Sequence, residues 1–290
     1  MTIVEYGSGD PLVLIPGSQG RWEYMRPAID ALSRVFRVLT FPLCGEPGSQ
    51  CRLDPSRGLD NYTAQVTSLL DSKRLAGATI CGVSFGGLIA LRFAACYPNR
   101  TKSLVLVSTP APMWHLRRRH QVYVRAPWIF GPVFLAESHW RLRAELAAAL
   151  PDRRHRSSFR RSLLQTFARA PLSLGRIAAR GRLIDGIDMC GDCAAVAAPT
   201  LIITGEHGLD HVVPADSSSA YTRLIANARA VVLERTGHLG LITRPEAFAA
   251  LVHEFVCGSK RERDEMGMER TGMQAESAGT EAMRSQSATP

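Results

Sequence analysis

Ser84 lies in the segment Gly82-Val83-Ser84-Phe85-Gly86-Gly87, directly after an apolar run and directly before a segment of helical period. A serine in a G-x-S-x-G turn between a strand and a helix is typical of a nucleophile held in a strained backbone conformation, with small residues two positions away on either side. The alternative is an ordinary glycine-rich turn that binds phosphate. Because the segment lacks the lysine of a P-loop and the glycine spacing of a dinucleotide-binding motif, we interpret Ser84 as a nucleophile.

A serine hydroxyl at its ordinary pKa is a poor nucleophile, so it needs a histidine base and a carboxylate that orients the base. His238 follows the last predicted strand in Thr236-Gly237-His238, and Asp210 follows an earlier strand in Asp210-His211-Val212-Val213-Pro214. The chain order serine, aspartate, histidine is expected when the three are mounted on one parallel sheet. The alternative for His238 is a capping histidine, and the alternative for Asp210 is a turn-forming aspartate. Glu206 is a possible substitute for Asp210 as the acid.

Short apolar runs alternate with segments of helical period through most of the chain, which predicts a doubly wound, mostly parallel α/β sheet. The predicted strands are Leu12–Ile15, Arg37–Phe41, Ala78–Cys81, Ser103–Ser108, Thr200–Thr204 and Ala230–Glu234. The predicted helices are Trp22–Ser33, Asn61–Arg74, Phe85–Cys96, Ala215–Ile225 and Arg244–Val256.

Residues 111–198 interrupt this alternation with a segment that has no strand-like run. Apolar residues recur there at helical spacing, and prolines 112, 127, 132, 151 and 171 predict several short helices. We expect an all-helical cap inserted into an α/β core formed by residues 1–110 and 199–257. Residues 258–290 lose the apolar periodicity and predict a disordered tail.

With these motifs in place, the chain over Thr2–Val256 resembles the α/β-hydrolase fold family, specifically its small single-domain serine hydrolases with a helical cap. The resemblance implies that Ser84, Asp210 and His238 are nucleophile, acid and base. It also implies that the backbone N–H groups of Ser18, after the strand ending in Pro16-Gly17, and of Phe85 bind the oxyanion. It implies neither a cofactor nor a metal.

This sequence departs from the family pattern in three places. Pro16 stands where the family usually has histidine, and Val83 replaces the common histidine before the serine. The chain also begins almost at the second family strand, Ile3–Tyr6, so either the first strand is absent or the given start is late. None of these changes touches the predicted triad.

The cap also predicts a substrate pocket and carries the charge. Its apolar aromatic residues are expected to line an acyl or aryl pocket, namely Trp114, Trp128, Phe130, Phe134 and Trp140. The formal net charge of the chain is +9, and residues 110–195 hold 15 basic and 6 acidic side chains. A solvated cap surface is favoured over a nucleic-acid site, and one or two cap arginines facing an anionic substrate group are the intermediate option.

Composition places the chain among globular proteins, with 46% hydrophobic and 21% charged residues. Seven scattered cysteines favour reduced thiols, and the lone Cys190-Gly-Asp-Cys193 favours neither a metal nor a redox site. Without a secretory signal or a membrane-spanning run, we expect a cytoplasmic protein that acts on a small molecule and binds neither membrane nor nucleic acid.

We therefore expect a serine hydrolase that cleaves a carboxylic ester through an acyl-enzyme. A C–C bond, lactone or amide/peptide hydrolase on the same triad, and a ligand-binding module without catalysis, are the alternatives.

Overall fold

The computed structural model describes residues 1–214 and 216–261, with the side chains at 134, 135, 138, 139 and 218 outside that description. Within these ranges seven strands form one sheet in the order β1-β3-β2-β4-β5-β8-β9. The first strand is antiparallel to its neighbour β3 and the other pairs are parallel, so the mostly parallel sheet is confirmed. The strands are β1 (Val4–Tyr6), β2 (Pro11–Ile15), β3 (Arg37–Thr40), β4 (Ala78–Val83), β5 (Thr101–Val107), β8 (Thr200–Thr204) and β9 (Ala228–Val232).

The central strands form because their side chains are buried on both faces, as their unbroken apolar sequences predict. Every residue of β4 and of β8 is buried. The register pairs Gly82 with Ile15 on one side and with Leu106 on the other, so β2, β4 and β5 end together at one edge. The last strand, expected to begin at Ala230, begins at Ala228 instead.

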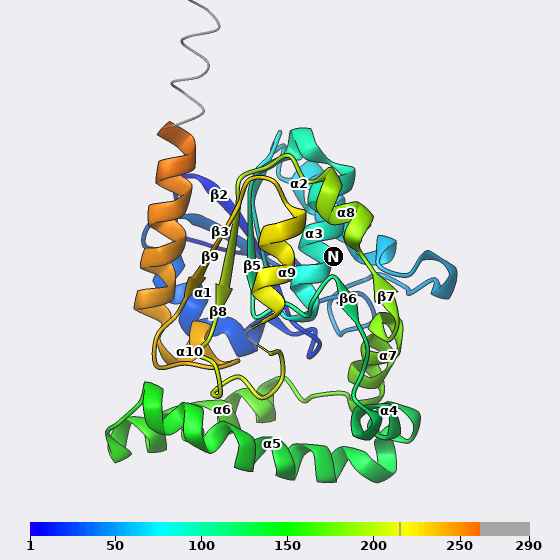
Figure 1. Ribbon diagram of the computed structural model, residues 1–290, viewed down its shortest axis with the longest axis vertical. Coiled ribbons are helices and arrows are strands. Elements are labelled where there is room, and N and C mark those ends of the chain that lie inside the picture. The colour runs from blue at the N-terminus through cyan, green and yellow to red at the C-terminus, as the bar shows by residue number, and fades with distance from the viewer. Residues whose placement is uncertain (215, 262–290) are drawn as a thin grey trace, which may run out of the picture. The chain divides into compact units, whose positions relative to one another are not determined.

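Helices cover both faces of this sheet (Figure 1). On one side lie α2 (Asp60–Ser72), α3 (Phe85–Cys96), α8 (Cys190–Ala195) and α9 (Ser217–Leu224), and on the other lie α1 (Arg26–Leu32) and α10 (Gly240–Thr243). Single 3-10 turns are η1 (Trp22–Met25), η2 (Pro55–Arg57) and η3 (Pro98–Arg100). A last helix begins at residue 245 and continues to residue 261. Of the helices within the described ranges, none is long and apolar enough to cross a membrane.

The cap segment, residues 111–198, joins β5 to β8 and differs from expectation in two ways. Its helices α4 (Arg118–Arg125), α5 (Pro127–Ala149), α6 (Arg153–Arg169) and α7 (Leu174–Ile184) gather beyond one end of the sheet (Figure 1). The segment is not all-helical, because β6 (Met113–Trp114) pairs with β7 (Ile187–Asp188) where the chain leaves and re-enters the core.

The second difference concerns Pro132, which we expected to separate two short helices but which lies inside α5. A proline inside a helix costs about 3 kcal/mol because it removes one backbone hydrogen bond. The later turns of α5 pack against the core through buried Glu145, Leu146 and Ala149, and these contacts hold the helix together.

Two further expectations change at the chain's cysteines and its C-terminal region. Cys44 and Cys51 form a disulfide, so the expectation of reduced thiols is wrong for this pair; the two residues lie in one loop, with Cα atoms 4.9 Å apart. The tail predicted to be disordered, 258–290, lies outside the described residues from 262 onward, and residues 258–261 are helical.

Candidate active site

Ser84 occupies the turn between β4 and α3 in a strained conformation, with φ of 53° and ψ of −119°. Such a positive φ is rare for a residue with a side chain and is found mainly where the surrounding structure enforces it. The backbone N–H of Ser84 donates to the carbonyl of Val107 at 2.8 Å, and the N–H of Gly87 donates to the carbonyl of Ser84 at 2.9 Å. These bonds fix the turn at the carboxyl edge of the sheet.

The glycines around Ser84 are required by close backbone approaches. A Cβ at Gly82 would lie 2.2 Å from the carbonyl oxygen of Gly86, and a Cβ at Gly86 would lie 2.4 Å from that of Pro16. Both distances are far below van der Waals contact. The G-x-S-x-G spacing therefore lets α3 begin directly against β2 and β4.

Asp210 and His238 come together from the loops that follow β8 and β9. His238 Nδ1 lies 3.2 Å from Asp210 Oδ2. The two loops run against each other, because a Cβ at Gly237 would lie 2.4 Å from the carbonyl oxygen of Leu209. Glu206, the alternative acid, instead accepts the backbone N–H of Arg235 at 2.6 Å.

The pKa values of this pair favour an ion pair. Burial raises the pKa of the Asp210 carboxyl, but the charge and hydrogen bond of His238 and the N–H groups of Val213 and Val212 bring it below the ordinary value. Burial lowers the pKa of His238, but the charge and hydrogen bond of Asp210, followed by the charge of Glu145, bring it above 6.5. Asp210 therefore stabilises the imidazolium form of His238.

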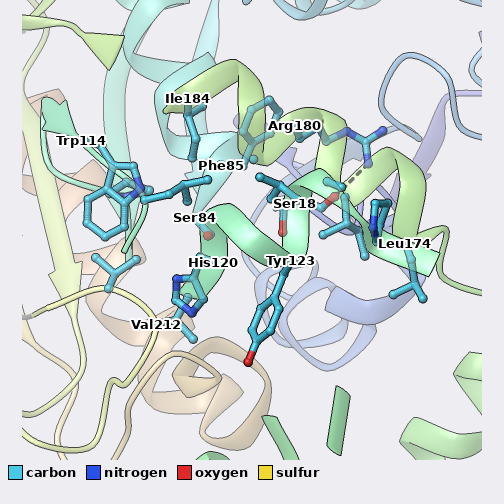
Figure 2. A pocket seen from close by; sticks show the side chains of 18 of the residues that line it. Ser18, Ser84, Phe85, Trp114, His120, Tyr123, Leu174, Arg180, Ile184 and Val212 are labelled. Carbon is cyan, nitrogen blue, oxygen red and sulfur yellow. Dashed lines mark hydrogen bonds between the residues drawn. The ribbon is translucent and has the colours of Figure 1, made fainter. Parts of the chain in front are cut away.

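Ser84 opens into two apolar cavities. The first, of about 160 Å³, extends under the cap and is shown in Figure 2. The second, of about 210 Å³, is lined by Ser84 and His238 and, from the cap, by Leu142 of α5 and Leu163 of α6. A substrate with an apolar group on each side of its reacting carbon would fit this arrangement.

The two expected oxyanion donors both lie beside Ser84. Phe85 is the first residue of α3, so its N–H has no acceptor inside the helix. Ser18 lines the first cavity together with Ser84, and a Cβ at its neighbour Gly17 would lie 3.5 Å from the Cβ of Ser84.

The structure places the five predicted pocket aromatics differently. Trp114 lines the first cavity (Figure 2). The ring of Phe130 lies 6.4 Å from that of Tyr123, a lining residue, but is not itself in the lining. Trp128 and Trp140 are 76% and 70% exposed and are not among its lining residues, because helical spacing alone does not tell the inner from the outer face. The Phe134 side chain lies outside the described residues.

Sequence reasoning missed a buried ion pair beside the site. Arg180 of α7 and Glu46 have side chains only 1% exposed each, and Arg180 Nη1 lies 2.9 Å from Glu46 Oε1. Arg180 also donates to the carbonyl of Ser18 at 2.8 Å, a contact drawn in Figure 2. Arg180 is among the lining residues of the first cavity, and the charge of its guanidinium is compensated by Glu46.

His120 and Tyr123 of α4 were also missed and line the first cavity (Figure 2). Burial and neighbouring arginines lower the pKa of His120 to about 4. His120 is therefore neutral at neutral pH, and the cavity wall stays weakly polar. Its position within an arginine-rich stretch gave no signal of this role.

Known proteins resemble this chain over most of its length. A family model described as alpha/beta hydrolase fold matches residues 10–245. The 2-hydroxy-6-oxo-2,4-heptadienoate hydrolase of Pseudomonas putida is 27% identical, with 87% of this chain and 91% of that protein aligned. The pimeloyl-[acyl-carrier protein] methyl ester esterase of Nitrosomonas europaea is also 27% identical, over 84% of this chain and 94% of the esterase.

Among solved structures, the enol-lactonase of Burkholderia xenovorans LB400 superposes with a TM-score of 0.72 at 23% identity, covering 88% of this chain and 96% of the lactonase. At that identity the likeness concerns the fold. The family model, which spans most of the chain, establishes that the chain belongs to the alpha/beta hydrolase fold family.

Proposed function

We propose that the protein is a serine hydrolase that cleaves carboxylic esters with apolar groups on both sides of the ester. The observation that carries this proposal is the strained Ser84, which shares a cavity wall with His238, whose Nδ1 faces the buried carboxylate of Asp210. The turn conformation projects the serine hydroxyl, and an imidazole base oriented by a carboxylate activates it.

In the proposed reaction Ser84 Oγ attacks the ester carbonyl while His238 takes the hydroxyl proton. The carbonyl oxygen becomes an oxyanion that accepts hydrogen bonds from the backbone N–H groups of Phe85 and Ser18. Each such donor lowers the activation free energy by about 3 kcal/mol. The C–O bond to the alcohol then breaks and His238 donates its proton to the leaving oxygen. Water, deprotonated by His238, attacks the acyl-enzyme, releasing the acid and restoring Ser84.

The two cavities support an uncharged substrate. Both are lined mainly by apolar side chains, and Arg180, a cation among the lining residues of the first cavity, is already held by Glu46. An acyl group in one cavity and an alcohol group in the other would each bury apolar surface away from water, which favours binding. An anionic group would have to displace Glu46 from Arg180.

A C–C bond hydrolase is the second candidate. It is favoured by the presence of Arg180 among the lining residues of the cavity into which Ser84 opens, and by a relative named 2-hydroxy-6-oxo-2,4-heptadienoate hydrolase. In this case a substrate carboxylate or enolate would take the place of Glu46 on Arg180.

Labelling with a fluorophosphonate probe tests the serine hydrolase. We expect one covalent adduct at Ser84, absent from Ser84→Ala and present in Ser158→Ala, a control on the exposed face of α6. No adduct on folded wild-type protein would instead indicate a ligand-binding module. Turnover of p-nitrophenyl esters of increasing acyl length, a lactone, an amide and 2-hydroxy-6-oxo-2,4-heptadienoate then separates the ester from its competitors.

A further inference from the structure

Glu145 of α5 is a buried carboxyl that reaches from the cap into the loop carrying His238. Glu145 is 0% exposed. Its Oε1 accepts the backbone N–H of Leu239, the residue after His238, at 2.6 Å. Its Oε2 has no hydrogen-bond partner within the described residues.

The buried environment of Glu145 makes its carboxyl unfavourable for the stability of the fold. Burial raises the pKa of the Glu145 carboxyl above its ordinary value, and the negative charge of Asp210 raises it further. The N–H groups of Gly237 and Leu239 and the charge of His238 act in the opposite direction and lower this pKa. A buried carboxyl that pairs with no arginine or lysine destabilises a core compared with an apolar side chain of the same size. Packing alone therefore does not explain a carboxyl here.

A second contact joins the same helix to the same loop. Arg235 Nε donates to the carbonyl of Ala148 at 3.0 Å, one turn along α5 from Glu145. Arg235 also donates its backbone N–H to Glu206. The histidine loop, residues 233–239, is thus held by α5 at two points on either side of His238.

We propose that Glu145 is a positioning residue for His238: from cap helix α5 it accepts the N–H of Leu239 and so fixes the loop that sets the imidazole between Asp210 and Ser84. Asp210 orients the ring from the core through Nδ1, and Glu145 orients its backbone from the cap. This inference rests on the proposed hydrolase function, because it needs His238 to act on Ser84.

The experiment compares Glu145→Ala with Glu145→Gln on a turned-over ester. The glutamine keeps a carbonyl oxygen that can accept the N–H of Leu239, whereas alanine removes the acceptor. We expect Glu145→Ala to lower kcat about 10- to 100-fold with KM changed less than about twofold, because a misplaced base slows the chemical step and not substrate binding. We expect Glu145→Gln to keep kcat within about fivefold of wild type.

Leu146→Ala is the matched control, since Leu146 is 6% exposed on the same helix and makes no contact with the site cavities. It removes buried packing from α5 without removing a hydrogen bond to the histidine loop. If Glu145→Ala and Leu146→Ala lose the same fraction of kcat at a temperature where both are folded, the role of Glu145 is structural and the inference fails. It also fails if Glu145→Gln is as damaged as Glu145→Ala.

Two further measurements keep the result decisive. If Glu145→Ala does not fold, Glu145→Asp replaces it, because the shorter side chain keeps a carboxyl but withdraws it from Leu239; wild-type kcat in Glu145→Asp would overturn the inference. The rate of fluorophosphonate labelling at Ser84 should fall with kcat. Wild-type protein that is not labelled at all contradicts the proposed function, whereas normal labelling in both wild type and Glu145→Ala contradicts only the role of Glu145.

Discussion

Asp210 and His238 form a fully anchored pair: Oδ2 of the aspartate lies 3.2 Å from Nδ1 of the histidine, and Oδ1 accepts the backbone N–H groups of Val212 and Val213 at 2.9 and 2.8 Å. Both carboxylate oxygens are therefore engaged, and the side chain of Asp210 is only 3% exposed. A carboxylate fixed in this way favours the tautomer with Nδ1 protonated, which leaves Nε2 able to accept a proton.

Asp210→Asn should lower kcat by roughly 10³ to 10⁴, because the amide no longer fixes the tautomer of His238 or stabilises its cation. Glu206→Gln is the control, since Glu206 accepts the backbone N–H of Arg235 and not the imidazole. We expect it to stay within about tenfold of wild type. Steady-state kinetics on one ester decide the matter, and the reverse ranking would make Glu206 the acid.

The pH dependence of kcat/KM should report the raised pKa of His238. The base must be neutral, so activity falls as the pH drops through this pKa, and the midpoint of the acid limb should lie above pH 6.5, the ordinary value. The charges of Asp210 and Glu145 raise this pKa. Asp210→Asn and Glu145→Gln should therefore move the midpoint to lower pH, whereas Glu206→Gln should leave it in place; a midpoint below 6.5 in wild type would contradict the assignment of His238 as the base.

Gly86→Ala should destabilise the fold, because the added Cβ would lie 2.4 Å from the carbonyl oxygen of Pro16 and the backbone must shift. We expect a loss of about 2 to 4 kcal/mol in the free energy of unfolding, measured by urea titration. Gly191→Ala in α8 is the matched control, since its Cβ would meet nothing within 4 Å. It should be neutral or stabilise by about 0.5 kcal/mol. Equal stabilities of the two variants would show that the elbow tolerates a side chain at Gly86.

Arg180→Met should cost about 3 to 5 kcal/mol of unfolding free energy, because it removes the buried one of the two arginines that contact the buried Glu46. Adding Glu46→Gln should recover much of that loss, since the double variant buries no net charge there. The coupling between the two changes in a double-mutant cycle measures the interaction. Additive losses would mean that Arg176, which also contacts Glu46 at 2.9 Å, and not Arg180 compensates the charge of Glu46.

The sequence predicted the sheet and the positions of the turn and loops that carry Ser84, Asp210 and His238, because the constraints on these segments are local. Gly82 and Gly86 flank Ser84 at a spacing that only close backbone packing explains, and His238 follows an apolar run that becomes β9. The cap is different, since its helices carry polar and apolar residues on several faces. Trp140 appeared as an inward residue and is 70% exposed, whereas Glu145 resembles any solvated glutamate and is fully buried. Its contact, Leu239, is 94 residues away in the chain, and sequence spacing has no access to such a pairing.

The cap aromatics give the last prediction, which concerns substrate size. Trp114 lines the cavity into which Ser84 opens, so Trp114→Ala should enlarge it and raise kcat/KM for long acyl esters relative to short ones by about tenfold. Trp128→Ala is the control, because Trp128 is 76% exposed outside that lining and its loss should leave the ratio unchanged. The measurement is kcat/KM over p-nitrophenyl esters from acetate to decanoate. An unchanged profile in Trp114→Ala would place the acyl group in the second cavity, between Leu142 and Leu163, with the alcohol group under Trp114.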